Sequence, residues 1–521
     1  MVSASKEQPQ KRGLLGSSLV VGFGTMLSRV LGLVRDVSVG HMFGAGGMVD
    51  AFFVAFKIPN FLRRLFAEGA FSQAFIPVLA EYKEKGGKAA VRDLVAHVEA
   101  WLGIWLTLVT LLLVLASPLV AMLFAPGFWW QGETAKLAEV GYMIKLTAPY
   151  LFFISLTSLS ASILNTYQRF AVPAITPVLL NISLIISALW LSPQFGVPVH
   201  ALALGVFVAG VVQFLFQLPF LWREGVLVFP VFKPKHPGVN KIGLLMIPAL
   251  FGVSVSQINL LLDTVLASLL QDGSVSWLYY SDRLVELPLG IIGIAIATVV
   301  LPSLSRDHAA KSTDGFAATL DWAIRLIILL GVPASIALIV LAEPMLSVIF
   351  YHGEMDYFSI QMATLSLRAY AFGLLAFMFI KILAPGFYSR QNTKTPVKIA
   401  IYAMLANMVL NLMLVFWLQH AGLALATALS SWLNAALLYV ALRKEINLTL
   451  SSASWLMLVR VVAATALMVL IIIWLQPLGE FWQLQDIWSR VIMLTKLVAV
   501  GIISYVFCLL LIGTRISQLK H

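Results

Sequence analysis

Long apolar runs follow one another along nearly the whole chain, and only short polar segments separate them. A helix needs about 20 predominantly apolar residues to cross the hydrocarbon core of a bilayer. The pattern predicts an all-α polytopic membrane protein with 14 transmembrane helices, at 14–43, 50–80, 93–124, 137–163, 172–191, 199–221, 242–269, 275–303, 318–350, 358–386, 396–418, 421–443, 455–476 and 489–513.

Composition agrees with this class. Of 521 residues, 60% are hydrophobic and 11% are charged, whereas a soluble domain carries about 25% charged residues. The first apolar run, which begins at Leu14, lacks a small-residue cleavage site, so we expect a retained helix. Cys508 is the only cysteine and lies in an apolar run, which excludes an intrachain disulfide.

Basic residues are unevenly distributed between the loops. Lys and Arg precede the first span and follow the even-numbered spans, notably in 81–92 and 222–241. The alternate loops contain little beyond Lys136 and Arg490. Because cytoplasmic loops carry an excess of Lys and Arg, both termini are predicted to be cytoplasmic. The net charge of +11 therefore reports loop topology, and nucleic acid is not an expected partner.

An internal repeat relates the two halves at a spacing of 225 or 226 residues. ASPLVAMLFAPG (116–127) aligns with AEPMLSVIFYHG (342–353), and FIPVLAEY (75–82) aligns with VLPSLSRD (300–307). The repeat predicts two six-helix lobes followed by two extra helices, a division that in transporters places the substrate site between the halves. The predicted parts are a tail (1–13), a first lobe (14–221), a linker (222–241), a second lobe (242–443), a helix pair (444–513) and a second tail (514–521).

Charged residues interrupt the apolar pattern most densely between Ser28 and Phe75. One Arg or Lys at the centre of a spanning helix costs roughly 2.5–3.5 kcal/mol, so several cations cannot all face lipid. In the second half, the corresponding span contains the charged residues Asp282, Arg283 and Glu286. Arg donates two parallel hydrogen bonds to phosphate oxygens, so a cavity rich in Arg suits a multiply anionic ligand.

Helical spacing sorts these charges only in part. On an ideal helix four positions fall within about 40° of one another, and they are Asp50, Lys57, Arg64 and Glu68. Arg63 falls on a different side, but Pro59 can kink the helix and rotate the residues after it. In the first span, Arg29 and Asp36 share a face and are expected to neutralise each other in part or to pair with the second span.

Sequence motifs for catalysis are missing. GAGG (44–47) lacks the Lys-Ser/Thr of a phosphate-binding loop and is predicted to be a turn between two spans. HExxH, CxxC and a nucleophile elbow do not occur. A membrane enzyme acting on lipid-linked sugars would need a catalytic acid on an exposed loop, for which Glu133 and Glu139 are available only in a short one. The chain is therefore predicted to be a transporter and not an enzyme.

Four segments carry a family resemblance: SRVLGLVRD, DAFFVAFKIPNFLRRLFAEGAFSQAF, SVSWLYYSDRLVELPLG and LAPGFYSRQNTKTPVKIA. They resemble the MurJ (MviN) family of bacterial lipid II flippases, in the multidrug/oligosaccharidyl-lipid/polysaccharide (MOP) exporter superfamily. The resemblance implies two lobes around a cationic cavity, with the last two helices forming a groove for the lipid tail. It implies movement of lipid II across the bacterial inner membrane by alternating access, for peptidoglycan synthesis, with lipid II, membrane lipids and other cell-wall synthesis proteins as partners.

The resemblance also assigns site residues. The family's essential arginines fall on Arg29, Arg35, Arg63 and Arg283, and its important acids on Asp36 and Asp50. Here the family favours Arg63 where helical spacing favours Arg64, and we follow the family. The complete candidate substrate set is Arg29, Arg35, Asp36, Asp50, Lys57, Asn60, Arg63, Arg64, Glu68 and Arg283. A sodium site known in some members falls on Asp263, Asn407, Asn411 and Thr427, where Asn411 departs from the acid that can occur there.

Several other functions stay open at this point. A drug exporter of the same superfamily should line its cavity with acids, and the charge here has the opposite sign. A flippase for another polyprenyl-diphosphate-linked oligosaccharide, of the O-antigen type, would share the cationic cavity. A pure scaffold would not need charges in its apolar spans. No cofactor is expected; with no ATP site, Na⁺ or the membrane potential is the expected energy source.

Overall fold

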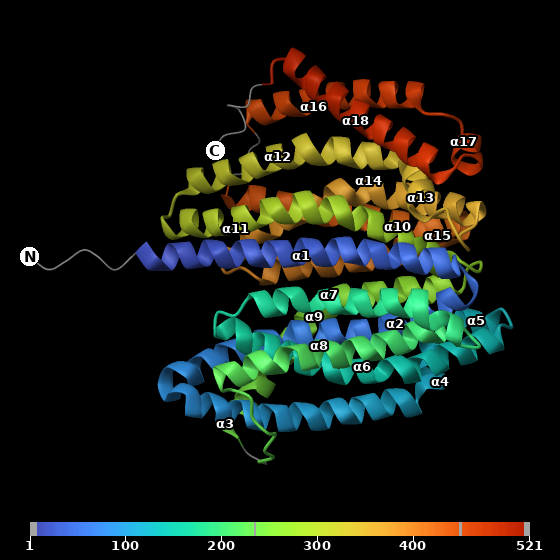
Figure 1. The fold of residues 1–521 in the computed structure, drawn as a ribbon. Helices are drawn as coiled ribbons and strands as arrows, with labels where there is room; N and C mark the ends of the chain where they lie inside the picture. The colour runs from blue at the N-terminus through green and yellow to red at the C-terminus, as the bar shows by residue number, and fades with distance from the viewer. Residues whose placement is uncertain (1–7, 234–235, 447–450, 515–521) are drawn as a thin grey trace, which may run out of the picture. The chain divides into compact units, whose positions relative to one another are not determined.

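The computed structural model describes residues 8–233, 236–446 and 451–514. Within these ranges the chain forms helices and contains no strand (Figure 1). The elements are α1 (Gln8–Phe43), α2 (Gly47–Leu62), the π-helix η1 (Arg63–Phe71), α3 (Ser72–Leu115), α4 (Ser117–Phe124), α5 (Pro126–Trp130), α6 (Thr134–Thr166), α7 (Ala171–Ile186), the π-helix η2 (Ser187–Leu191), the 3₁₀ turn η3 (Ser192–Gln194), α8 (His200–Glu224), α9 (Pro237–Ser268), α10 (Ser274–Pro288), the π-helix η4 (Leu289–Gly293), α11 (Ile294–Ala309), α12 (Thr313–Val340), α13 (Ala342–Phe350), α14 (Tyr357–Tyr388), α15 (Lys394–Ile446), α16 (Ser452–Leu475), α17 (Gly479–Leu484) and α18 (Ile487–Leu511). Most of both predicted tails lies outside the described residues.

The predicted spans coincide with helices. Ten helical segments of the described chain are long and apolar enough to cross a membrane. Two of them, α3 and α15, contain a sharp bend, and each covers parts of two predicted spans. The spans predicted at 14–43 and 242–269 correspond to α1 and α9, which are helical but not among those ten. The all-α membrane class is confirmed, while the number of crossings stays a prediction.

Two predicted loops are replaced by single-residue bends. The 81–92 segment is helical on both sides of Gly87, where φ is 59° and ψ is −152°. Glycine reaches this left-handed region without a Cβ clash, so one residue turns the chain and its neighbours stay helical. In α15 the bend falls at Gln419, with φ 49° and ψ −131°. GAGG (44–47) forms the predicted turn, with positive φ at Gly44 and Gly46.

The repeat motif has the same local geometry in both halves. The helix breaks at Ala116 (φ −89°, ψ 12°) between α3 and α4, and at Leu341 (φ −92°, ψ 13°) between α12 and α13. A proline follows each break, at Pro118 and Pro344. The predicted spans 93–124 and 318–350 therefore each contain two helices, because a proline is tolerated in the first turn of a new helix and not in the interior of a continuing one.

Contacts divide the chain into two compact units, 1–272 and 273–521. α9 packs against α3 and η1 in the first unit, although the sequence assigns it to the second lobe. The predicted lobe boundaries stay a prediction. The core of the first unit joins α3, α6 and α9 through buried side chains such as Phe75, Leu79 and Ile163.

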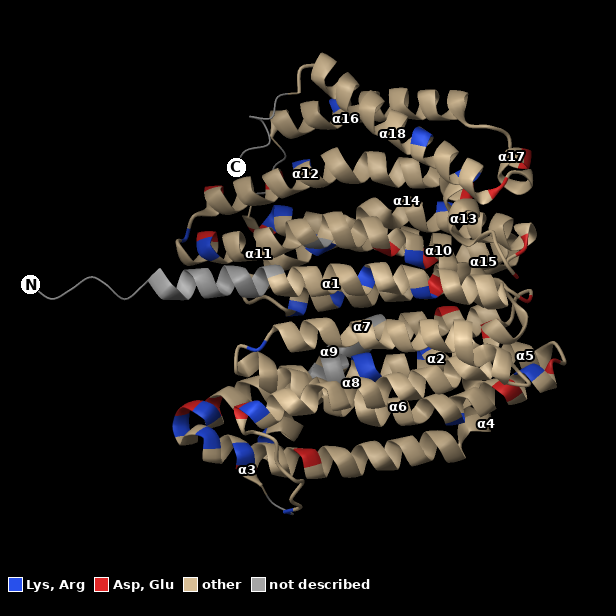
Figure 2. Cartoon of the chain, in the orientation of Figure 1, with Lys and Arg blue, Asp and Glu red and all other residues tan. Residues whose placement is uncertain are grey.

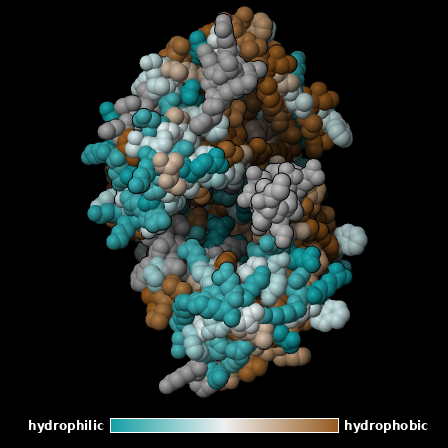
Figure 3. All heavy atoms as spheres, turned by 90° about the vertical axis from the view of Figure 1, so that its left-hand side faces the viewer, coloured by the Kyte–Doolittle hydropathy of each residue, from teal (hydrophilic) through white to brown (hydrophobic). Residues whose placement is uncertain are grey.

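Charged residues are arranged differently at the ends and in the middle of the helices. Figure 2 shows basic and acidic positions gathered at the bend of α3 and others isolated within α1. In the first unit, the end that carries the bend presents mainly hydrophilic atoms, and brown hydrophobic atoms lie beside it (Figure 3). The isolated charges inside the helices are the ones that require partners.

Candidate functional site

Arg35 is held in the interior of the first unit by two neighbours. Its Nε and Nη2 atoms donate to Asp36 Oδ1, at 2.9 and 2.7 Å, and Nη1 donates to Asn181 Oδ1 at 3.0 Å. Arg35 is 8% exposed and Asp36 is 2% exposed. The amide of Asn181, on α7, also donates to the Ser28 carbonyl at 2.9 Å. Arg35 and Asp36 thus form a buried ion pair that Asn181 fixes to α7.

This pairing refines the sequence prediction for α1. Asp36 is joined to its direct neighbour Arg35, a contact that helical spacing does not anticipate because adjacent residues usually diverge. Arg29 is half-buried one turn and a half earlier on the same helix. Sequence reasoning missed Asn181, since an amide on a helix 146 residues away gives no local signal.

α2 carries three of the predicted cavity residues, and two of them, Lys57 and Asn60, make hydrogen bonds near its end. Lys57 Nζ donates to Thr264 Oγ1 of α9 at 2.9 Å. Asn60 donates to the Phe56 carbonyl at 3.1 Å and accepts a 3.4 Å hydrogen bond from Arg63 Nε. A hydroxyl of α9 is thus one partner of Lys57.

The helix is π-helical from Arg63 to Phe71, four residues after Pro59. A π-helix widens the turn to i→i+5 bonding, and such segments often occur at functional sites. The 100° spacing used for the sequence prediction therefore stops applying at Arg63. Arg63 is half-buried beside Asn60, whereas Arg64 is exposed. The side chain of Glu68 lies outside the described part of the structure.

Asp50 belongs to a second charged group, centred on Lys136 of α6. Lys136 Nζ contacts Asp272 and lies 3.4 Å from Glu133 and 3.9 Å from Asp50. The Phe128 ring centroid is 4.1 Å from the same nitrogen. Lys136 is 6% exposed and Asp50 is 1% exposed. One buried ammonium therefore joins carboxylates from α2, from the start of α6 and from the loop after α9.

Asp272 is fixed from a second direction as well. The Gly47 N–H donates to Asp272 Oδ2 at 2.8 Å. Partial burial by itself raises the Asp272 pKa, but the hydrogen bonds from Lys136 and Gly47 outweigh it, so the pKa lies below the ordinary value. Nearby, a Cβ at Gly127 would lie 1.9 Å from the Ser268 carbonyl oxygen, so α5 meets the end of α9 at a position that only glycine fits. The sequence signal for this group was Lys136 itself, because the loops on its side of the membrane contain few other basic residues.

Arg283 lies in the second unit and is more accessible. Its Nη1 donates to Glu286 Oε2 at 2.7 Å, and its Nη2 lies 3.3 Å from the Tyr279 hydroxyl. The guanidinium also lies over the Tyr279 ring, 4.8 Å from the centroid. The Arg283 side chain is 29% exposed and that of Glu286 is 47% exposed. This guanidinium is oriented by its neighbours yet remains partly exposed.

Three of the four predicted sodium residues come together in the second unit. Asn411 donates to Asn407 Oδ1 at 2.9 Å, and Asn407 donates to Thr427 Oγ1 at 3.4 Å and Ser430 Oγ at 3.3 Å. Both asparagines are fully buried. Asp263, the only acid of the set, lies on α9 in the first unit. The second unit thus contributes a neutral network of amides and hydroxyls.

Comparison with known proteins identifies similar sequences. The family model for lipid II flippase MurJ matches residues 39–494. The probable lipid II flippase MurJ of Vibrio cholerae is 51% identical over 97% of this chain and 98% of its own length. The corresponding protein of Haemophilus influenzae is 49% identical over 94% of this chain and 98% of its own.

Solved structures give the same result for the fold. A structure of lipid II flippase MurJ in an inward closed conformation superposes with a TM-score of 0.80, at 25% identity, over 94% of this chain and 98% of that one. An inward-facing multidrug resistance MATE transporter of the MOP superfamily has a TM-score of 0.65 at 14% identity, over 80% of this chain and 98% of its own. The second likeness concerns the fold alone.

Proposed function

The chain belongs to the MurJ family of lipid II flippases, and on this premise we propose that it translocates lipid II from the cytoplasmic to the periplasmic leaflet by alternating access. Lipid II is the undecaprenyl-diphosphate-linked disaccharide-pentapeptide used in peptidoglycan synthesis. The observation that carries the proposal is the family match over 39–494, which spans both the α2–η1 segment and Arg283. The match also favours lipid II over an O-antigen-type substrate.

The diphosphate is the part of this substrate that the charged residues would recognise. Arg63 and Arg283 are both accessible in part and each keeps a hydrogen-bonding neighbour, so a phosphate can approach a guanidinium that is already oriented. Arg35 has three guanidinium hydrogen bonds within the protein. We therefore assign Arg63 and Arg283 to direct phosphate contact, and Arg35 to positioning α1 against α7.

The energy source in this proposal is the membrane potential. Moving two negative charges outward across 100 mV, inside negative, releases about 4–5 kcal/mol. Dissipating the potential at constant pH gradient should therefore slow lipid II export. If export does not depend on the potential but stops when sodium is removed, coupling to sodium is favoured instead. The predicted sodium site is then Asp263, Asn407, Asn411 and Thr427.

Orientation follows from the basic loops. We place both termini and the segments 81–92 and 222–241 of this multi-pass inner-membrane protein in the cytoplasm, where other cell-wall synthesis proteins would reach them. Cysteines introduced in these segments should resist a membrane-impermeant thiol reagent in intact cells. Rapid labelling there would overturn the direction of transport as well as the topology.

The decisive experiment measures lipid II at the outer leaflet after acute depletion of the protein. Accessible lipid II should fall on depletion and recover when the wild-type chain is expressed again. An Arg283→Ala chain at equal membrane abundance is the matched control and should restore much less. Accessibility that does not change on depletion would remove the proposed function.

A further inference from the structure

Two histidines and an aspartate meet where α9 begins. Asp93 and His97 lie one turn apart on α3, after its bend at Gly87, and His236 immediately precedes α9. The two imidazole rings are stacked, with centroids 4.6 Å apart and planes 17° apart. His97 and His236 are 5% and 4% exposed, whereas the Asp93 side chain is 59% exposed. All three residues are distinct from the charged groups around Arg35, Lys136 and Arg283.

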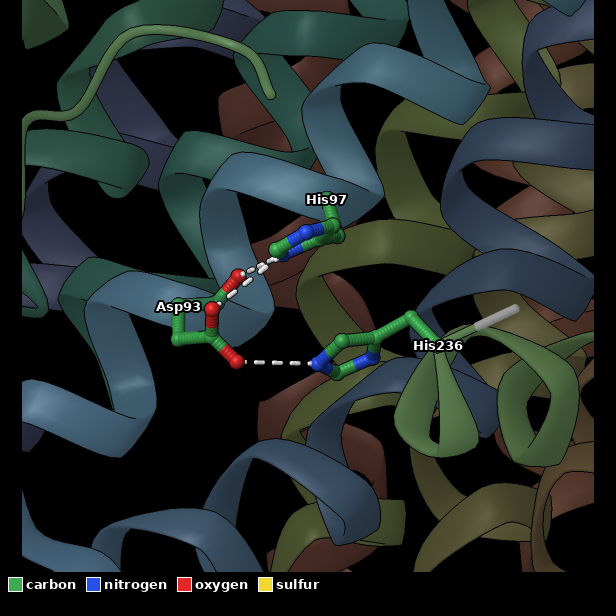
Figure 4. A group of neighbouring side chains, drawn as sticks. All are labelled: Asp93, His97 and His236. Carbon is green, nitrogen blue, oxygen red and sulfur yellow. Dashed lines mark hydrogen bonds and ion pairs between the residues drawn. The ribbon is translucent and has the colours of Figure 1, made fainter. Parts of the chain in front are cut away.

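The spacing of the three groups matches a metal site. Asp93 Oδ2 lies 3.0 Å from His236 Nε2, and Asp93 Oδ1 lies 3.4 Å from His97 Nδ1 (Figure 4). One ligand atom from each residue can be chosen so that all three lie within 4.8 Å of one another. In a tetrahedral zinc site with bonds of about 2.0–2.1 Å, neighbouring ligand atoms are about 3.3 Å apart. With either Asp93 oxygen taken as the ligand, its spacing to one imidazole nitrogen is already close to this value.

We propose that Asp93, His97 and His236 bind a divalent transition metal of the Zn²⁺ class, with water completing the coordination at the exposed Asp93 side. Two imidazole nitrogens and one carboxylate oxygen are the ligands that Zn²⁺, Co²⁺ and Ni²⁺ accept, whereas Mg²⁺ and Ca²⁺ prefer oxygen alone.

Binding has an identifiable cost at each histidine. His236 Nδ1 accepts a 3.4 Å hydrogen bond from the Val239 N–H, so metal binding at Nε2 moves the ring proton to Nδ1 and gives up that long bond. His97 Nδ1 lies 2.6 Å from the Asp93 carbonyl oxygen and must turn from it towards the ion. Both costs fall on local hydrogen bonds, and the one net positive charge of the occupied site lies on the side where Asp93 is exposed.

The bound ion would fasten the start of α9 to α3. The segment before α9 already runs along α3, since the Val231 N–H donates to the Ala96 carbonyl at 3.0 Å and Trp101 Nε1 donates to the Lys233 carbonyl at 3.2 Å. Just beyond the cluster, α3 and α9 border an apolar cavity of about 610 Å³, lined in part by Val98 and Ile242. The ion therefore sets the separation of the two helices at the end of this cavity.

The test uses the full chain purified in detergent, without a polyhistidine tag and after treatment with a chelator. Equilibrium dialysis with Zn²⁺, and Co²⁺ absorption in the visible range, should show one saturable site that excess Mg²⁺ does not displace. His97→Ala and His236→Asn should each weaken binding by more than about 100-fold, because even outer partners of metal ligands contribute 10–100-fold. His236→Asn keeps an acceptor for capping α9, so this variant should fold.

His308→Ala removes an exposed histidine of α11 and is the matched control, which should bind like the wild type. Zn²⁺ should also raise the midpoint of thermal unfolding of the wild type and of His308→Ala, but not of His236→Asn. Absence of a saturable site would overturn the proposal. So would binding that Mg²⁺ displaces, or binding that persists in both His97→Ala and His236→Asn.

Discussion

Arg35 and Arg283 both belong to the candidate substrate set derived from the sequence, yet the structure places them in opposite environments. Arg35 is 8% exposed and donates to Asp36 and Asn181. The Arg283 side chain is 29% exposed, and its carboxylate partner Glu286 is 47% exposed. The first arginine is held through all three of its guanidinium nitrogens, and the second is oriented by a partner that is itself about half-exposed.

The difference teaches how burial decides what an ion pair does. Removing one partner of a buried pair costs about 3–5 kcal/mol, because the remaining charge is left in a poor solvent. An exposed pair contributes about 0–1 kcal/mol, so its arginine can change partners at little cost. We therefore expect the pair on α1 to act on stability and Arg283 to act on ligand affinity.

The largest effect is expected from Asp36→Ala. Without this carboxylate the buried Arg35 charge loses an ion-pair partner, and the free energy of unfolding should fall by about 3–5 kcal/mol. Thermal unfolding of the purified protein and its abundance in the membrane measure this. Glu286→Ala is the control and should change stability by no more than about 1 kcal/mol.

Removal of both charges sharpens the same comparison. The double variant Arg35→Met, Asp36→Leu should recover most of the stability lost in Asp36→Ala, because apolar replacements of a buried pair are often tolerated. Equal stabilities of Asp36→Ala and Glu286→Ala would abolish the distinction between the two environments.

A smaller effect, confined to binding, is expected from Arg283→Ala. One charge-assisted hydrogen bond contributes roughly 1.5–3 kcal/mol, so lipid II affinity should fall about tenfold to a hundredfold at unchanged abundance. Arg283→Lys keeps the charge but loses the planar fork, and should be intermediate or null. Binding of lipid II to purified protein and complementation of a depleted strain measure this. A fully functional Arg283→Ala protein would contradict the assignment.

The sequence predicted the membrane class and the helices because apolar runs of about 20 residues are typical of membrane-spanning helices and rare in soluble domains. It also predicted that charges inside those runs need partners. It did not predict Asn181 or Asp272 as partners, because both contacts join segments more than a hundred residues apart. It placed Arg63 and Arg64 by a constant 100° rotation, which the π-helix at Arg63–Phe71 breaks. The sequence therefore predicts which helices contain charged residues, and tertiary packing decides which residues these charges contact.

The group around Lys136 is intermediate between the two arginines. Its ammonium is buried like Arg35, but the side chain of Asp272 is 46% exposed. Asp272→Asn removes this charge and keeps an oxygen for the Gly47 N–H, so it should lower stability at neutral pH by less than Asp36→Ala does. Thermal unfolding of the two purified variants side by side measures the difference.

The smallest effect, a dependence on pH, follows from the Asp272 pKa. Hydrogen bonds from Lys136 and Gly47 place it below the ordinary value in the folded protein, against the opposing effect of partial burial. An unfolded aspartate has a pKa of about 3.9. A depressed folded pKa contributes stability that is fully present above the unfolded value and is lost as the pH falls through the folded one. The gap in unfolding temperature between wild type and Asp272→Asn should therefore be constant above about pH 5 and close below about pH 3.9. A gap that keeps its full size in strong acid would mean that the Asp272 charge does not hold Lys136.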